Sequence, residues 1–174
     1  MAFEVLKQLN LAAEDAAGTH GLIRILTKTS IASFKSTAAA GNYGVYVFGM
    51  RGQGGAVTPW YVGLAKAQTF ASEAMAPDKL RKYSAAMFGR NGTPVITLVA
   101  WSSVDHESLI DDLERLLIWV ARAKNSRLLN ERKVSSSPKS IIALVNKIEI
   151  KGVLNRGPGQ PSHAAQAFKA YLGI

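Results

Sequence analysis

The stretch Gly44–Lys66, GVYVFGMRGQGGAVTPWYVGLAK, decides how this chain folds. Its two ends are rich in β-branched and aromatic residues, a composition typical of strands. The glycines and Pro59 between these ends are typical of a hairpin connection. A phosphate-binding loop would run into a helix, whereas this glycine-rich segment runs into a second strand-like segment. The stretch therefore predicts an antiparallel hairpin with a glycine-rich tip.

The residues before the hairpin predict helices. Residues 3–17 and 20–34 are typical of two helical segments, with Gly18 and Gly21 as the punctuation between them. We therefore expect an N-terminal helical extension over residues 1–41.

After the hairpin the pattern alternates between helix and strand. Pro77 and Asp78 open a predicted helix that ends at Phe88, and residues 94–101 predict a third strand. The clearest helix lies over residues 105–123, with acidic residues in its first turns and basic residues in its last. Its apolar stripe consists of Leu109, Ile110, Leu113, Leu116, Leu117 and Val120.

The end of the chain predicts one more strand, over residues 146–155, and a terminal helix over residues 162–172. The fold class is therefore α+β: a small antiparallel or mixed three-stranded sheet flanked by helices, with added N-terminal helices and a C-terminal strand and helix. A chain of 174 residues is the length of a single domain. Residues 42–133 would be its core and residues 134–174 a basic C-terminal extension.

Composition narrows the classes of function. The chain has no cysteine, which excludes disulfides and thiolate metal sites, and its three histidines are scattered too widely to suggest a zinc cluster. No apolar run approaches the length of a membrane span, and acidic residues interrupt the N-terminus where a signal peptide would be apolar. The sequence predicts a soluble, cytoplasmic protein with no membrane partner.

The positive charge is concentrated near the C-terminus. The chain carries a formal net charge of +9, and residues 121–174 hold ten Lys or Arg against two acidic residues, a balance of +8. Such a region favours a polyanionic partner through phosphate neutralisation and counterion release. The simpler interpretation is a basic, solvated surface. A nucleic acid, with DNA preferred, is the partner that we expect.

Four short motifs together resemble the GIY-YIG endonuclease domain. They are GVY at residues 44–46, YVG at residues 61–63, Glu114 in the long helix and Asn130 after it. The resemblance covers residues 42–133. It implies a metal-dependent endonuclease that hydrolyses phosphodiester bonds in DNA.

The resemblance also implies a role for each motif residue. Glu114 would hold Mg²⁺ or Mn²⁺, Tyr46 would activate the attacking water, Tyr61 would orient water or phosphate, and Asn130 would order the site. Tyr46 can act as a base only where nearby cations lower its pKa, and Lys66 and the metal are the candidates. The expected nucleic-acid contacts are Lys66, Lys79, Arg81, Lys82, Arg127, Arg132 and Lys133.

The residues around Glu114 support a cation at its carboxylate. Glu114 lies at the margin of the apolar stripe and has no basic residue one turn further on, where Leu117 and Ile118 stand. A carboxylate in that position needs a cation from elsewhere, and Mg²⁺ sites use one or two carboxylates. The alternative is an ordinary solvated glutamate.

One departure from the family leaves activity open. The position of the family's arginine is held by Glu73, or by Ala71 if no insertion is allowed, and neither can stabilise an anion. A cation from residues 79–82 would have to replace it. Otherwise the domain would be a non-catalytic nucleic-acid-binding or interaction module. These alternatives differ in whether such a cation reaches Glu114 and the tyrosines.

Overall fold

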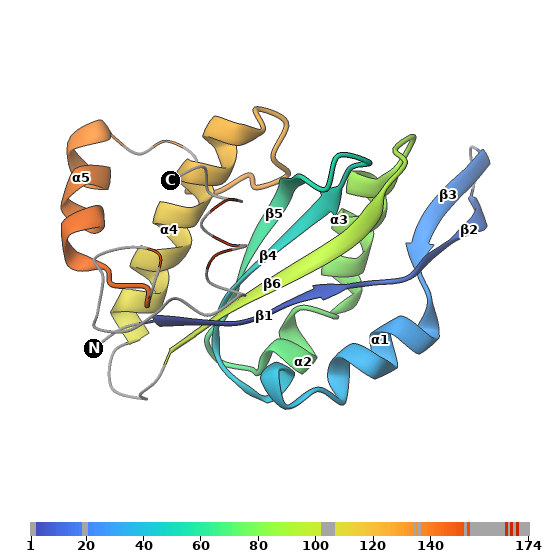
Figure 1. Ribbon diagram of the computed structural model, residues 1–174, viewed down its shortest axis with the longest axis horizontal. Helices are drawn as coiled ribbons and strands as arrows, with labels where there is room; N and C mark the ends of the chain where they lie inside the picture. Colours follow the sequence, from blue (N-terminus) through green and yellow to red (C-terminus); the bar gives the residue numbers. More distant parts are fainter. Residues whose placement is uncertain are drawn as a thin grey trace.

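A computed structural model gives the architecture for residues 3–18, 21–101, 107–133, 135, 137–151, 153, 166, 168 and 170. At its centre lies a four-stranded sheet in which every neighbouring pair is antiparallel (Figure 1). In spatial order the strands are β1 (Phe3–Asn10), β6 (Thr93–Trp101), β4 (Gly44–Arg51) and β5 (Val57–Ala65). β5, the second strand of the β4–β5 hairpin, therefore forms one edge of the sheet, and β1 forms the other edge.

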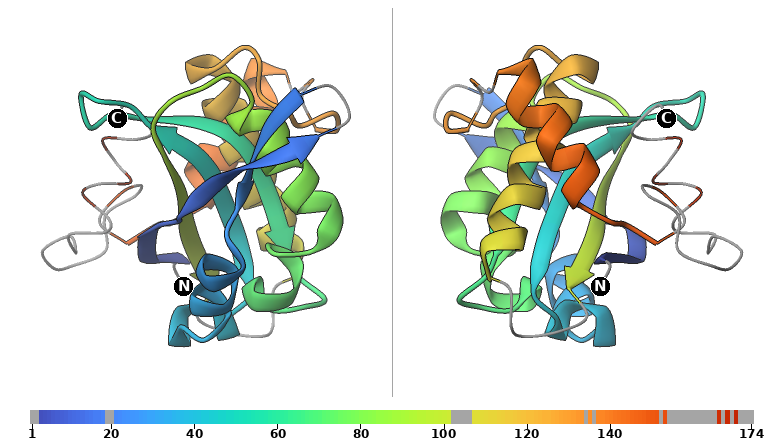
Figure 2. Two further views of the ribbon diagram at one scale, coloured as in Figure 1. Left: turned by 90° about the vertical axis from the view of Figure 1, so that its right-hand side faces the viewer. Right: turned by 90° about the vertical axis from the view of Figure 1, so that its left-hand side faces the viewer.

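Helices cover both faces of this sheet (Figures 1 and 2). One face packs against α4 (Glu107–Lys124), and α5 (Pro138–Lys147) joins the same hydrophobic cluster. The other face packs against α1 (Lys28–Lys35), α2 (Phe70–Glu73) and α3 (Pro77–Met87). A short 3₁₀ helix, η1 (Ala38–Gly41), leads from α1 into β4. A separate hairpin of β2 (Ala13–Gly18) and β3 (Gly21–Leu26) packs on α3.

Strand β4 divides the core because successive side chains of a strand point to opposite faces. Val45 and Val47 join the cluster under α4, whereas Tyr46, Phe48 and Met50 join the cluster under α3. All five side chains are buried. Tyr46 therefore belongs to the α3 side of the sheet.

A bulge in β5 places two adjacent aromatic residues on the face of the sheet that holds Tyr46. Phe48 pairs with Tyr61 and Gly49 pairs with Pro59, which leaves Trp60 as an extra residue between the two pairs. Both Trp60 and Tyr61 lie in the α3-side cluster as a result. Tyr61, the tyrosine of the YVG motif, shares the face of Tyr46 through the regular pairing of Gly63, Val62 and Tyr61 with β4, and the bulge adds Trp60 to that face.

The central part of the sequence-based prediction is confirmed. The hairpin forms as β4 and β5, the helix after it as α3, the third strand as β6 and the long amphipathic helix as α4. The fold is α+β with a mainly antiparallel sheet, as expected. Of the residues described, none belongs to a helix with the length and apolarity that a membrane span requires.

The predicted N-terminal helices are largely wrong, because Phe3–Asn10, Ala13–Gly18 and Gly21–Leu26 form β1, β2 and β3, and the α-helix among the described residues before β4 is limited to Lys28–Lys35. β1 adds a fourth strand to the sheet where three were expected. Its register shifts between Val5 and Lys7, so Phe3 and Val5 enter one cluster while Leu6 and Leu9 pack on the other. This bulge breaks the two-residue alternation and leaves apolar spacings that resemble those of a helix.

The predicted late strand is also wrong in its extent. Residues 138–147 form α5. Ile150 forms an isolated parallel bridge with Phe3 of the edge strand β1. The start of α5 has an ordinary sequence signal, since Ser137 caps Ser140 N–H and Pro138 follows the cap. Most of the predicted terminal helix lies outside the described residues. The three residues of it that are described, Gln166, Phe168 and Ala170, are helical.

Candidate functional site

Tyr46 and Gly63 form a cross-strand pair in the two sequence motifs. The Tyr46 ring lies directly over Gly63, because a Cβ placed on Gly63 would stand 2.1 Å from Tyr46 Cζ and 2.2 Å from its hydroxyl oxygen. The Tyr61 ring lies 6.2 Å from the Tyr46 ring, centroid to centroid. The final glycine of YVG therefore makes room for the tyrosine of GVY.

The hydroxyl of Tyr46 is buried inside the protein. The side chain has 0% exposure, and its oxygen makes no hydrogen bond of standard geometry with the described residues, although Tyr83 is near enough to influence it. Burial raises the pKa of Tyr46 far above its ordinary value, and the neighbouring Tyr83 and Tyr61 raise it further. Lys66, the lysine that was a candidate for lowering the pKa of Tyr46, bonds to Asp111 Oδ2 at 2.8 Å.

Tyr61 is the residue at which charges from several elements meet. The Lys82 Nζ atom lies 5.3 Å from the centre of the Tyr61 ring, within cation–π range. Burial raises the pKa of Tyr61, while the charge of Lys79 opposes that rise and the charge of Glu114 adds to it. The Tyr61 side chain thus lies within electrostatic reach of α3 on one side and of α4 on the other.

Lys79 belongs to an ion-pair cluster that includes the position of the missing arginine. Its Nζ atom lies 2.7 Å from Asp78 Oδ2 and 3.3 Å from Glu73 Oε1. Burial on its own would lower the pKa of Lys79, but hydrogen bonds to Asp78 and Glu73 and the nearby negative charges raise it. Lys79 therefore remains an ammonium ion, only 16% exposed, beside Tyr61. Glu73 is therefore paired with a lysine.

Glu114 also has a cationic partner, and it comes from beyond the helix. Lys133 Nζ lies 2.5 Å from Glu114 Oε2 and 3.1 Å from Asp111 Oδ1. Lys66 Nζ bonds to the other Asp111 oxygen at 2.8 Å. Burial opposes the charge of Lys133, but Glu114 and Asp111 outweigh it and raise the pKa of Lys133. Glu114 is 13% exposed, in agreement with its predicted place at the margin of the core.

Asn130 is bonded to the outer edge of the YVG motif. Its side-chain oxygen accepts from Val62 N–H at 2.9 Å, and its side-chain nitrogen donates to the Val62 carbonyl at 2.7 Å. Leu129 N–H donates to the Trp60 carbonyl, and Asn125 Nδ2 donates to the Pro59 carbonyl. The segment after α4 thus pairs with the free edge of β5.

The structure brings together seven of the residues predicted for the site or for nucleic-acid contact. They are Tyr46, Tyr61, Lys66, Lys79, Lys82, Glu114 and Lys133. Arg81, Arg127 and Arg132 are exposed instead, and the ion pairs between described residues do not include them. Lys82 also lies 3.9 Å from Glu131, so α3 and the segment after α4 meet around the edge of β5.

Sequence reasoning missed Asp111, which shares Lys133 with Glu114 and binds Lys66. Arg115, on the same helix, pairs with Asp112 at 4.0 Å. A usable signal was present, because Asp111 stands three residues before Glu114 and so projects from the same side of α4.

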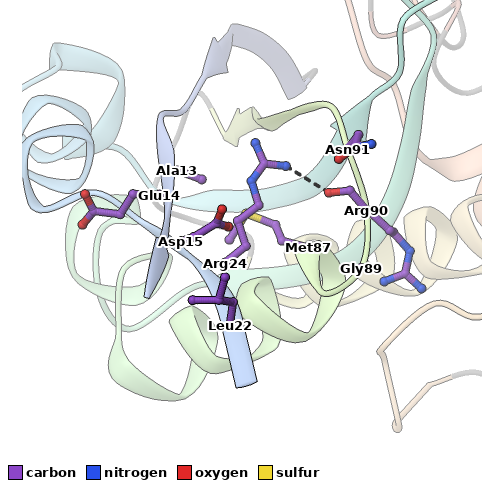
Figure 3. Close-up of a pocket in the computed structure, with 9 residues that line it drawn as sticks. All are labelled: Ala13, Glu14, Asp15, Leu22, Arg24, Met87, Gly89, Arg90 and Asn91. Carbon is purple, nitrogen blue, oxygen red and sulfur yellow. Dashed lines mark hydrogen bonds between the residues drawn. The ribbon is translucent and has the colours of Figure 1, made fainter. Parts of the chain in front are cut away.

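A cavity of about 480 Å³ lies elsewhere, between the β2–β3 hairpin and the end of α3 (Figure 3). Its lining includes Glu14, Asp15 and Arg24, and Arg24 Nη1 donates to the Arg90 carbonyl at 3.1 Å. The Arg90 guanidinium turns away and lies 3.8 Å from the centre of the Trp60 ring. The lining contains none of the residues predicted for the site.

No protein-family model matches this chain, and the comparisons with curated proteins and with solved structures found no match. The GIY-YIG resemblance therefore stays a prediction made from the motifs.

Proposed function

We propose that this domain is an endonuclease of the GIY-YIG type that hydrolyses phosphodiester bonds in DNA at the Tyr61 edge of the sheet. One observation supports the proposal above all others. Lys82 Nζ lies 5.3 Å from the centre of the Tyr61 ring, and the charges of Lys79 and Glu114 both act on the pKa of Tyr61, although more than thirty residues separate the two lysines of α3 from Glu114. Such a meeting of cations and a carboxylate is what the hydrolysis of an anionic ester requires.

The cations would act on the phosphoryl group. In hydrolysis a water oxygen bonds to phosphorus while the bond to the leaving sugar oxygen breaks. One proton leaves the water for solvent, and the leaving oxygen takes one from solvent. Negative charge builds on the non-bridging oxygens during this step. Lys79, with Lys82 beside it, would offset that charge and so take the place of the missing arginine.

Tyr46 would have a different role from the one first expected, whereas Tyr61 would keep its role. Tyr46 is fully buried and its raised pKa keeps it a neutral phenol, so it would support the site from below rather than act as a base. Tyr61 is 8% exposed and lies among the cations, so its hydroxyl would orient the water or the phosphate. Asn130 would hold the YVG backbone in place through Val62.

The carboxylates of α4 fit a divalent cation. Glu114 and Asp111 share one positively charged group, the Lys133 ammonium, and this arrangement supports the proposal that a cation can bind between them. Oxygen donors of this kind suit Mg²⁺ or Mn²⁺. Glu114 would hold the metal, with Asp111 as a second carboxylate. A metal bound there would supply Lewis-acid stabilisation of the phosphoryl oxygens.

The second candidate is a nucleic-acid-binding module that does not cut. Two observations favour it: Lys133 already neutralises Glu114, and burial raises the pKa of both tyrosines. Binding without hydrolysis would still use the exposed cations Arg81, Arg127 and Arg132, because phosphate contacts need only positive charge.

A nicking assay on supercoiled DNA with Mg²⁺ separates the two candidates. The wild type is compared with Lys79→Met, Tyr61→Phe and Glu114→Gln. We expect Lys79→Met and Glu114→Gln each to slow nicking by about a hundredfold or more, because each removes charge stabilisation of the transition state. Lys28→Met, an exposed lysine on α1 away from these contacts, is the matched control and should nick like the wild type.

Equal nicking by the wild type and all three site variants would rule out this site. A wild type that binds DNA with a steep salt dependence but never nicks it would establish the binding module instead.

A further inference from the structure

Lys133 occupies the position that the proposed function assigns to a metal. Its Nζ atom bridges Glu114 Oε2 at 2.5 Å and Asp111 Oδ1 at 3.1 Å. The two carboxylates stand one turn apart on α4, so one compact cation can touch both. The inference that follows rests on the proposed function, because it concerns the same pair of carboxylates.

The backbone at Lys133 has an unusual conformation beside this contact. Its φ angle is 59°, and no other non-glycine residue in the described part of the chain has a positive φ. That conformation is unfavourable for a residue with a Cβ atom and persists where the surroundings impose it. Here it accompanies an ammonium group placed on two carboxylates that are 13% and 35% exposed.

The local charges balance without any metal. Lys66 holds the second oxygen of Asp111 at 2.8 Å, so two ammonium groups face the two carboxylates Asp111 and Glu114. A divalent ion added to this arrangement would meet the Lys133 charge at close range, where repulsion between like charges is strong. It could reach both carboxylates only after the Lys133 side chain moves away.

We propose that Lys133 is the resident cation of the Asp111–Glu114 pair, and that a divalent metal binds there only by displacing it. The carboxylate pair is then closed to free metal ions while Lys133 is in place. Lys133 would thereby act as a built-in competitor of the metal, in addition to any contact that it makes with nucleic acid.

Mn²⁺ binding to the DNA-free protein tests this inference without any reference to cleavage. The affinity is measured by calorimetry and by the spin-resonance signal of free Mn²⁺. We expect Lys133→Met to bind Mn²⁺ at least about tenfold more tightly than the wild type, because it leaves both carboxylates without their shared cation. Lys133→Met combined with Glu114→Gln should lose that gain. Lys66→Met is the control that leaves Lys133 in place, and its gain should be smaller.

Three results would overturn the inference. One is a wild type that binds Mn²⁺ as tightly as Lys133→Met. Another is a gain in Lys133→Met that survives Glu114→Gln. The third comes from a comparison of the wild type with Glu114→Gln, which needs no Lys133 variant. Tight Mn²⁺ binding by the wild type that is lost in Glu114→Gln would contradict the inference. Nicking decides the proposed function separately, so either idea can fail while the other stands.

Discussion

At the scale of single residues, the tyrosine opposite position 63 requires a glycine there. A Cβ there would come within 2.1 Å of the buried Tyr46 ring. We expect Gly63→Ala to lower the free energy of unfolding by about 1–3 kcal/mol, because the ring must shift in a packed core. Urea denaturation would measure the loss.

Gly54→Ala is the matched control for that change. Gly54 lies at the hairpin tip, and nothing stands within 4 Å of a Cβ built on it. Its stability should be equal to that of the wild type or slightly higher, since alanine restricts the unfolded chain. If Gly63→Ala were as harmless as Gly54→Ala, the Tyr46 ring would not be held over Gly63.

The hydroxyl of Tyr46 provides a second test at this scale. It is buried without a hydrogen bond of standard geometry to the described residues, whereas the Tyr83 hydroxyl donates to the Ala74 carbonyl at 2.8 Å. Tyr46→Phe should leave stability unchanged or raise it by up to about 1 kcal/mol, because an unpaired buried hydroxyl is unfavourable. Tyr83→Phe should lower it by about 0.5–1.5 kcal/mol. Thermal melts of the two variants would measure this difference. A Tyr46→Phe variant that is less stable than Tyr83→Phe would contradict the prediction.

At the scale of elements, the edge of β5 depends on one side chain from the segment after α4. Asn130 satisfies both the N–H and the carbonyl of Val62. We expect Asn130→Ala to lower the free energy of unfolding by about 1–3 kcal/mol, because it leaves two backbone groups of the buried Val62 unpaired. It should also speed hydrogen exchange at the Val62 amide.

Asn130→Asp separates the two bonds. The carboxylate can still accept from Val62 N–H but cannot donate to the Val62 carbonyl, so its loss of stability should be smaller than that of Asn130→Ala. Equal losses in the two variants, with Val62 exchange unchanged, would mean that the edge is held by other contacts.

At the scale of the whole molecule, Asp111 connects parts of the chain that lie far apart in sequence. It bonds Lys66 at the end of β5 and Lys133 after α4. Burial opposes ionisation of Asp111, but the hydrogen bonds from Lys66 and Lys133 outweigh it and lower its pKa below the ordinary 3.8. Because the unfolded chain takes up this proton first, the stabilisation is complete above about pH 4 and is lost as pH falls through the lowered pKa.

Asp111→Asn removes this pH dependence. We expect the melting temperature of the wild type to exceed that of the variant near neutral pH, and the difference to shrink below about pH 4. Thermal melts from about pH 6 to about pH 2.5 would measure it. A difference that stays constant to the lowest pH would show that Asp111 is not linked to folding by its charge.

Much of the fold could be predicted because its signals are local. The strands around Tyr46 and Tyr61, the helix that begins at Pro77 and the stripe of α4 each carry their own pattern. β1 could not be predicted in the same way, since its bulge after Val5 disturbs the alternation and its partner strand lies some ninety residues away. The helix α5 could have been found from Ser137 and Pro138.

The candidate site likewise has features that follow from local sequence and features that do not. The sequence by itself determined the residue types, their order and the place of Glu114 at the margin of a helix, because these follow from spacing along the chain. Only the tertiary structure decided the partners: Lys79 beside Tyr61, Lys133 on Glu114 and Asn130 on Val62. Ion pairs and edge contacts depend on distances across the fold, and loop and strand geometry sets those distances in ways that no local pattern records.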